Sequence, residues 1–404
     1  MSLNATPTGS RVHIGLFGRR NAGKSSVINA VTGQDLAIVS EVKGTTTDPV
    51  YKSMELLPLG PVVLIDTPGL DDEGRLGGQR VKKALQVLNK SDLALLVVDG
   101  VQGLQPEDEE ILKKFHERNL PYLLVFNKLD EARAQCPERL APDARRPDAL
   151  WVSAATGENI DALRRRVADL APPEEDRFKI VSDLLAPGDT VVLVVPIDSA
   201  APKGRLILPQ QQTIRDILEA DGVSLVVKES GLREALASLK APPRLVITDS
   251  QAFGEVAKIV PRDIPLTSFS ILMARNRGNL EHAVRAVRAV ETLEDGDTVL
   301  IAEGCTHHRQ CGDIGTEKLP AWIREFTGKE PEFVFTSGTE FPEDLSGFHL
   351  IIHCGGCMLN EREMKYRLRM AVDQNIPMTN YGVAIAYMTG ILERSVRPFI
   401  TLIS

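Results

Sequence analysis

The chain has 404 residues, of which 43% are hydrophobic and 25% charged, and its formal net charge at pH 7 is −8. This length exceeds what one ordinary hydrophobic core serves, so we expect two or three domains of a folded globular protein. The acidic balance gives no general attraction to nucleic acid. No apolar run reaches membrane-spanning length and the polar first ten residues carry no signal-peptide pattern, so we expect a cytoplasmic location without a membrane partner.

A glycine-rich segment at residues 18–25 reads Gly-Arg-Arg-Asn-Ala-Gly-Lys-Ser. It follows an apolar, strand-like run at 12–17 and precedes a helix-like segment at 26–31, which is the setting of a phosphate-binding P-loop. Its glycines allow successive backbone N–H groups to surround phosphate oxygens at a helix N-terminus. A chance glycine-rich turn is the alternative, and the motifs that follow argue against it. The predicted nucleotide contacts here are Gly18, Asn21, Gly23, Lys24, Ser25 and Ser26.

Four further motifs follow the P-loop in the order expected of a GTP-binding domain. The polar segment 44–48 suits a switch loop in which Thr46 completes a Mg²⁺ shell that Ser25 begins. Asp66 ends a strand-like run and can hold a Mg²⁺-bound water, while the N–H of Gly69 can meet the γ-phosphate. A carboxylate at Asp130 can accept from guanine N1–H and the exocyclic amine, which adenine lacks. The predicted base-site residues are Asn127, Lys128, Asp130, Ser153, Ala154 and Ala155.

The motif set resembles that of the translation-factor-related GTPases, in particular the Era and MnmE branch. The resemblance implies that Lys24 contacts the phosphates, that Ser25 and Thr46 bind Mg²⁺, and that Asp66 acts through a water. It also implies that Asp130 recognises guanine.

Two residues predict slow hydrolysis that K⁺ stimulates. Leu70 stands where Ras-like enzymes carry the Gln that orients water, and an apolar side chain cannot do this. Asn21 matches, in the MnmE branch, a residue that helps to bind K⁺, whose charge takes the place of an arginine finger. We therefore expect Lys24, Thr46 and Asn21 to act in catalysis.

A proline- and acid-rich stretch at 171–176 is interpreted as a linker. Beyond it, β-branched runs alternate with helix-like segments, which predicts a parallel or mixed α/β sheet. No group of ionisable residues stands out there, so we expect a spacer or homodimerisation module. The expected fold class is α/β, with a P-loop GTPase domain at 1–172, a middle domain at 173–270 and a third domain at 271–404.

Four of the five cysteines lie beyond residue 300. Thiols clustered in this way indicate metal binding or catalysis more often than disulfides. Cys305 follows one apolar strand-like run and the segment His353-Cys354-Gly355-Gly356-Cys357 follows another, and α/β folds place ligands at such strand ends. Three thiolates suit a [4Fe–4S] cluster with one iron left to another ligand, but zinc on three Cys and one His fits equally well.

The pattern of Cys305, His307, His353, Cys354 and Cys357 resembles the signature of the HydF family, GTPases that mature [FeFe]-hydrogenase. The order of the domains agrees with that family over essentially the whole chain. The resemblance implies a [4Fe–4S] cluster on the three cysteines, with His307 and His353 as candidates for the remaining position. It further implies dimerisation through the middle domain. The implied role is a scaffold that carries a di-iron subcluster precursor to apo-[FeFe]-hydrogenase, with the radical-SAM maturases HydE and HydG as further partners.

Two alternatives stay open at this point. One is a GTPase assembly factor for ribosome or tRNA modification with a structural zinc, against which stand the acidic charge and the lack of a recognisable RNA-binding module. The other is a redox enzyme gated by GTP, for which no flavin or nicotinamide fingerprint is present. Two local expectations complete the prediction: one long helical pattern over 271–293, and a solvated charged face on a helix at 361–372.

Overall fold

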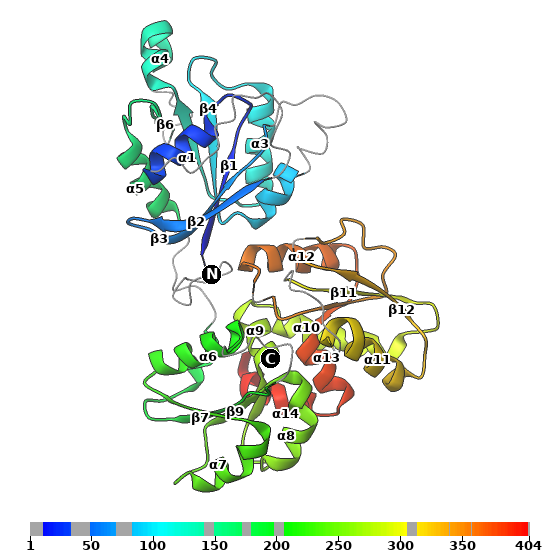
Figure 1. The fold of residues 1–404 in the computed structure, drawn as a ribbon. Coiled ribbons are helices and arrows are strands. Elements are labelled where there is room, and N and C mark those ends of the chain that lie inside the picture. The colour runs from blue at the N-terminus through cyan, green and yellow to red at the C-terminus, as the bar shows by residue number, and fades with distance from the viewer. Residues whose placement is uncertain are drawn as a thin grey trace. The chain divides into compact units, whose positions relative to one another are not determined.

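A computed structural model of the chain describes residues 11–33, 49–69, 83–140, 149–171, 179–197, 206–304, 313–338, 340–356 and 358–402 (Figure 1). They form two compact units, Met1–Asp176 and Arg177–Ser404. Several residues with predicted roles lie outside the described ranges: Thr46, Leu70, Cys305, His307 and Cys357.

The first unit is built on a six-stranded sheet. Its strands, in spatial order, are β2 (Val50–Leu56), β3 (Gly60–Asp66), β1 (Val12–Phe17), β4 (Leu93–Asp99), β5 (Tyr122–Asn127) and β6 (Leu150–Trp151). β2 runs antiparallel to β3, and the other neighbours are parallel. The central strands are covered on both faces and therefore read as nearly continuous apolar runs. Their carboxyl ends share one edge, where the nucleotide motifs begin.

Helices cover both faces of this sheet (Figure 1). α1 (Lys24–Thr32) and α5 (Ile160–Leu170) bury apolar side chains on one face, and α3 (Pro106–Glu117) packs with the helical residues 83–90 on the other. The rings of Phe17 and Phe115 meet edge to face at 5.3 Å in this second layer. A further helix, α4 (Leu129–Gln135), follows β5 directly.

The second unit contains two parallel four-stranded sheets with the same connectivity. In each, the first strand lies between the second and the third, and the fourth pairs with the third. The middle sheet consists of β7 (Thr190–Val194), β8 (Val223–Val227), β9 (Leu245–Thr248) and β10 (Leu266–Ser268), and the third sheet of β11 (Thr298–Ala302), β12 (Glu332–Thr336), β13 (Leu350–His353) and β14 (Met378–Asn380).

The correspondence between the two sheets extends to local sequence. Gly-Asp-Thr leads into both β7 and β11, and the two glycines, Gly188 and Gly296, have φ of 86° and 83°. The fourth strands read Leu-Thr-Ser and Met-Thr-Asn and end in helix caps, since Ser268 accepts from the N–H of Ile271 and Asn380 from that of Val383. The middle and third domains are therefore two versions of one βαβ architecture.

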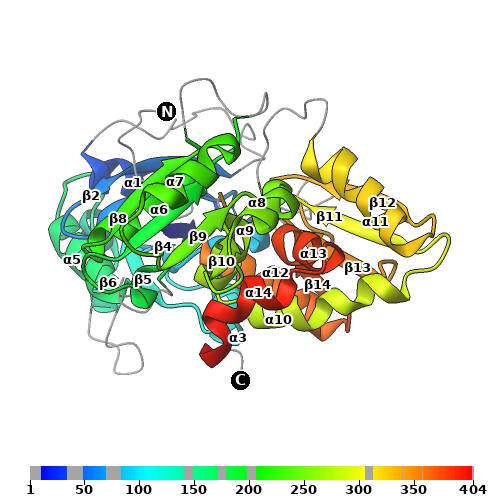
Figure 2. The same ribbon diagram turned by 90° about the horizontal axis from the view of Figure 1, so that it is seen from below.

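The helices of the second unit are α6 (Leu208–Glu219), α7 (Leu232–Ser238), α8 (Phe253–Ile259), α9 (Phe269–Asn276), α10 (Leu280–Ala286), α11 (Leu319–Thr327), α12 (Glu361–Asp373), α13 (Tyr381–Met388) and α14 (Leu392–Val396). α9 and α13 contact each other in a continuous core that takes one face of each sheet (Figure 2). α12 covers the other face of the third sheet, where Met364 packs against Leu300 and Ile351.

The predicted α/β fold class is confirmed, but one local expectation is wrong and a second is wrong at one residue. The single helix over 271–293 is broken because Gly278 adopts φ of 72°, and the N–H groups of Gly278 and Asn279 close α9 on the carbonyls of Arg275 and Ala274. This is the Schellman arrangement, which glycine favours. The expected solvated charged face of α12 contains Arg367, which is fully buried and ion-paired within the helix to Glu363.

Candidate functional site

The P-loop connects β1 to α1 through residues of positive φ: Gly18 (141°), Asn21 (62°) and Gly23 (90°). A Cβ on Gly18 would lie 2.1 Å from the carbonyl oxygen of Val97, and a Cβ on Gly23 would lie 2.2 Å from Nδ2 of Asn127. No side chain fits at such distances, so both positions require glycine. The loop is thus held tightly against the ends of β4 and β5.

Lys24 is buried at the start of α1, where its ammonium is held by the loop itself. Its Nζ donates to the carbonyl oxygens of Gly18 and Arg19, each at 2.9 Å. Ser26 lies in the same first turn of α1. The loop therefore holds a positive charge beside the N-terminus of a helix, which is the electrostatic arrangement that binds a phosphate chain.

Ser25 and Asp66 meet at the position expected of a Mg²⁺ site. The hydroxyl of Ser25 donates to Oδ2 of Asp66 at 2.6 Å, whereas the buried Oδ1 has no hydrogen-bond partner among the described residues. Burial raises the pKa of Asp66, against the hydrogen bond of Ser25 and the charge of Lys24, which lower it. A hydrated cation would supply both the missing partner and the compensating charge. Gly69 follows at the same edge of the sheet.

Replacing Asp66 by Asn should raise the thermal stability of the nucleotide-free protein but lower its Mg²⁺-dependent GTP turnover. In the nucleotide-free wild type, protonation of Asp66 removes a buried charge and so stabilises the fold. This stabilisation is present at low pH and is lost as pH rises through the raised pKa of Asp66. Asp66→Asn is neutral throughout, and we expect it to melt about 2–5 °C higher at neutral pH. This gap should shrink in acid. Its Mg²⁺-dependent GTP turnover should fall about 10–100-fold.

Thermal melts with and without Mg²⁺–GTP, across pH, test this prediction. Asp169→Asn, an exposed position on α5, is the matched control and should change neither quantity. A nucleotide-free Asp66→Asn protein that melts below the wild type at neutral pH would contradict the account of the buried charge.

Asn127 joins three of the motifs at the end of β5. Its Nδ2 donates to the P-loop carbonyl of Ala22 at 3.1 Å, and its Oδ1 accepts from the N–H of Ala154 at 3.0 Å. Asp130 lies in the first turn of α4, and its Oδ1 accepts from the hydroxyl of Ser153 at 2.7 Å. Residues 154–156 form the turn after Ser153. Phosphate and base motifs are therefore fixed relative to each other by side-chain hydrogen bonds.

Asp99, at the end of β4, is a member of this network that the sequence motifs did not identify. Lys128, held at φ of 62°, donates its Nζ to Oδ2 of Asp99 at 2.6 Å. Burial would raise the pKa of Asp99, but the Lys128 hydrogen bond and the N–H groups of Gln102 and Val101 together lower it. The feature that could have identified Asp99 is its position at the end of an apolar strand. In the sheet it pairs with Asn127 on β5.

In the third sheet, the strand that precedes Cys305 in the sequence ends beside the strand that precedes Cys354. β11 and β13 pair as far as Ala302 and His353, and the N–H of Cys354 donates to the carbonyl of Ala302 at 2.9 Å. The sulfur of Cys354 accepts from the N–H of Gly304 at 3.0 Å and of Gly356 at 3.4 Å. Gly304, the residue before Cys305 in the sequence, therefore lies against Cys354.

Glycine allows this close approach of the two strand ends. A Cβ on Gly304 would lie 2.9 Å from Cγ of Leu359 and 3.5 Å from Cα of Gly356, and Gly356 itself has φ of 63°. The N–H groups aimed at Cys354 stabilise negative charge on its sulfur, as a metal-binding thiolate needs. Cys354 therefore suits the role of a thiolate ligand.

A buried, hydrogen-bonded pair, Tyr381 and Glu303, lies beside Cys354. The hydroxyl of Tyr381 donates to Oε1 of Glu303 at 3.2 Å, and a Cβ on Gly315 would come within 2.3 Å of that hydroxyl. Burial, with the negative charges of Cys354 and Glu303, raises the pKa of Tyr381 well above its usual value. Tyr381 therefore stays a hydrogen-bond donor at physiological pH. Sequence reasoning did not single out this pair.

His353 is fully buried, with Nδ1 2.8 Å from the carbonyl oxygen of Cys354 and Nε2 3.0 Å from Nη1 of Arg367. Within the described part of the chain, no three potential metal ligands come together. Cys305, His307 and Cys357 are outside that part.

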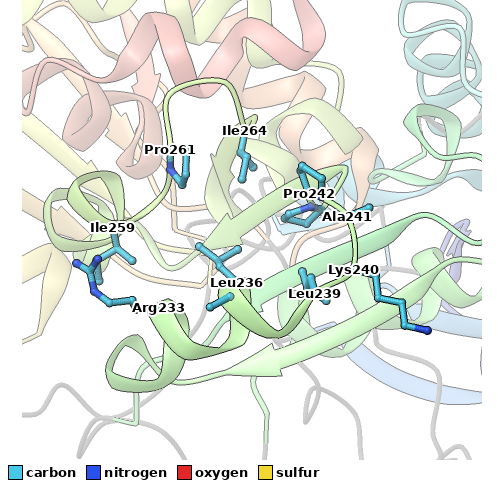
Figure 3. A pocket seen from close by; sticks show the side chains of 11 residues that line it. Arg233, Leu236, Leu239, Lys240, Ala241, Pro242, Ile259, Pro261 and Ile264 are labelled. Carbon is cyan, nitrogen blue, oxygen red and sulfur yellow. The ribbon is translucent and has the colours of Figure 1, made fainter.

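A hollow in the middle domain lies apart from these residues, between α7 and the segment from α8 to β10 (Figure 3). Its lining is mainly aliphatic and proline, with Arg233 and Lys240 as the basic members. It contains none of the predicted site residues.

Fold and site together define a P-loop GTPase domain followed by a unit of two related α/β domains. Residues 13–128 match the family model of the 50S ribosome-binding GTPase, residues 180–278 that of the hydrogen maturase F dimerization domain, and residues 281–398 that of the hydrogen maturase F tetramerization domain. The chain belongs to the hydrogen maturase F family. Its first domain is accordingly of the GTPase class, and its second and third domains match a dimerization and a tetramerization domain.

Two curated relatives, both tRNA modification GTPases, are similar to the first domain. The tRNA modification GTPases MnmE of Nitrosomonas europaea and Thiobacillus denitrificans are 38% and 36% identical over 154 and 160 residues, or 38% and 39% of this chain. The chain spans about a third of their length, 33% in each case. Among solved structures, Aquifex aeolicus Era bound to GDP and AlF4⁻ covers 54% of this chain and 93% of its own at 22% identity and a TM-score of 0.36.

No helix in the described ranges has both the length and the apolarity needed to cross a membrane.

Proposed function

We propose that this protein is a GTP-dependent iron–sulfur scaffold that carries a di-iron subcluster precursor to apo-[FeFe]-hydrogenase. In this proposal Cys305, Cys354 and Cys357 hold a [4Fe–4S] cluster. The self-associating protein works with the hydrogenase and with the radical-SAM maturases HydE and HydG, in the cytoplasm. The three domains take the limits 1–172, 173–270 and 271–404.

The observation that carries the proposal is the contact of Gly304 with the sulfur of Cys354, at 3.0 Å. It supports the proposal because it sets the residue before Cys305 against Cys354, in a chain of the hydrogen maturase F family. A bound cluster would supply an iron site with an exchangeable ligand. The residues of this chain would hold it, direct N–H groups at the sulfur of Cys354, and keep the Tyr381–Glu303 pair beside it.

The GTPase domain supplies the nucleotide chemistry of the proposal. Lys24 and the P-loop N–H groups bind the phosphates, Ser25, Thr46 and Asp66 serve Mg²⁺, and Asp130 selects guanine. Hydrolysis is slow and acts as a switch, because Leu70 cannot orient water.

A second part of the proposal is that K⁺ supplies positive charge at the P-loop, with Asn21 as one of its ligands. Asn21 is exposed at φ of 62°, so its side chain is available to a ligand. We expect turnover in K⁺ to exceed turnover in Na⁺ by at least about tenfold, and Asn21→Ala to remove the difference. Equal rates in the two salts would sink this assignment.

Anaerobic reconstitution of the full-length protein, with iron, sulfide and zinc analysis and an absorption spectrum, tests the scaffold proposal. Brown protein with matched iron and sulfide that activates apo-hydrogenase is the expected result. Colourless protein with one zinc per chain would overturn the proposal and favour an assembly factor for ribosome or tRNA modification.

A further inference from the structure

The two residues His353 and Cys354 present their side chains to opposite faces of the third sheet. Successive side chains of a strand alternate between faces. Ile351 packs in the core under α12, whereas Ile352 and Cys354 belong to the core shared with the middle domain. His353 lies two residues after Ile351 and therefore faces the same side of the sheet. Its Nε2 lies 3.0 Å from Nη1 of Arg367 on α12.

Arg367 uses its guanidinium to connect this histidine to its surroundings. It is 0% exposed, and its Nε donates to Oε1 of Glu363 at 2.9 Å while its Nη2 donates to the carbonyl of Gly338 at 2.9 Å. The guanidinium also lies 5.1 Å from the ring centre of Phe341. A buried arginine with this many partners is fixed in position, and so is the group that it contacts.

These contacts determine the roles of both ring nitrogens. A guanidinium has only donors, so Nε2 of His353 accepts from Arg367. The proton therefore sits on Nδ1, which donates to the carbonyl oxygen of Cys354 at 2.8 Å. Binding a metal through Nε2 would take an acceptor from a buried cation, and binding through Nδ1 would release the carbonyl of Cys354.

We propose that His353 is a positioning residue, not an iron ligand. Anchored by Arg367 and Glu363, it fixes the backbone at Cys354 so that the sulfur of Cys354 stays against Gly304. The position on iron that the cysteines leave open then belongs to another group. This inference rests on the proposed cluster function.

The test compares full-length variants after anaerobic reconstitution: His353→Ala, His353→Gln, Arg367→Leu, the double variant of the first and third, and Arg367→Lys. Arg369→Leu, an exposed arginine of the same helix, is the matched control. Two quantities are measured: iron retained against a chelator, and nitrogen hyperfine coupling to the reduced cluster by pulsed EPR.

We expect His353→Ala and Arg367→Leu each to weaken iron retention about 10–100-fold, with no further loss in the double variant. His353→Gln, which keeps an acceptor for Arg367, should restore retention and leave the nitrogen coupling unchanged from the wild type. Arg369→Leu should behave as the wild type does. If Arg367→Leu does not fold, Arg367→Lys should show the same loss to a smaller degree.

Loss of a directly bonded nitrogen signal in His353→Gln would overturn the inference, because His353 would then be a ligand. Wild-type retention in the folded arginine variants would overturn it also. A wild-type protein that takes up no iron would instead disprove the cluster function, before any variant is compared.

Discussion

Replacing Asp130 by Asn is expected to lower the affinity for GTP at least about 100-fold and to create affinity for xanthosine triphosphate. The carboxylate can accept from both guanine N1–H and the exocyclic amine, and an amide loses one of these interactions. Xanthine presents a carbonyl where guanine has the amine, and the amide can donate to it. A site built to hydrogen-bond a group rejects its analogue strongly.

Nucleotide titrations of the two proteins give the measurement. Ser153 holds Oδ1 of Asp130 at 2.7 Å, and an amide oxygen can accept the same bond, so the variant should keep its fold. Glu131→Gln, at the exposed neighbouring position of α4, is the matched control. An Asp130→Asn protein with unchanged preference for GTP would place base recognition elsewhere.

The nucleotide motifs could be identified from sequence because each consists of a few adjacent residues at the end of an apolar strand. Their spacing along the chain is enough to order them. The links between them could not be identified in this way. Asn127 contacts Ala22 across 105 positions and Asp99 meets Lys128 across 29, and both contacts depend on the order of strands in the sheet.

The third domain shows the same limit. The apolar runs before Cys305 and Cys354 predict two strands whose ends carry thiols, and β11 and β13 are neighbours. The helix expected over 271–293 failed because apolar spacing continues across Gly278, while a positive φ there ends α9. Likewise, the charges of α12 gave no sign that Arg367 is buried, since only the packing of β13 beneath the helix decides this.

Comparison of the two C-terminal sheets distinguishes a feature that the turn requires from a feature that the proposed metal site requires. β9 pairs with β7 up to Thr248, as β13 pairs with β11 up to His353, so Asp249 occupies the position of Cys354. Asp249 accepts from the N–H two residues later, at 3.2 Å from Gln251, as Cys354 does from Gly356. A side-chain acceptor at this strand end thus serves the turn in both domains. A thiol is present only in the third.

Cys354 is only partly buried at the end of its strand, so Cys354→Ala should leave the chain folded although the turn loses its side-chain acceptor, and it should remove the proposed cluster. We expect reconstituted iron to fall at least about tenfold, since metal binding depends on the full ligand set. GTP turnover should stay within about twofold of the wild type, because the nucleotide residues belong to a separate compact unit. Cys136→Ala, which removes a buried thiol from the GTPase domain, is the matched control and should retain its iron. Undiminished iron and an unchanged spectrum in Cys354→Ala would refute the assignment of the thiol site, whatever the GTPase domain does.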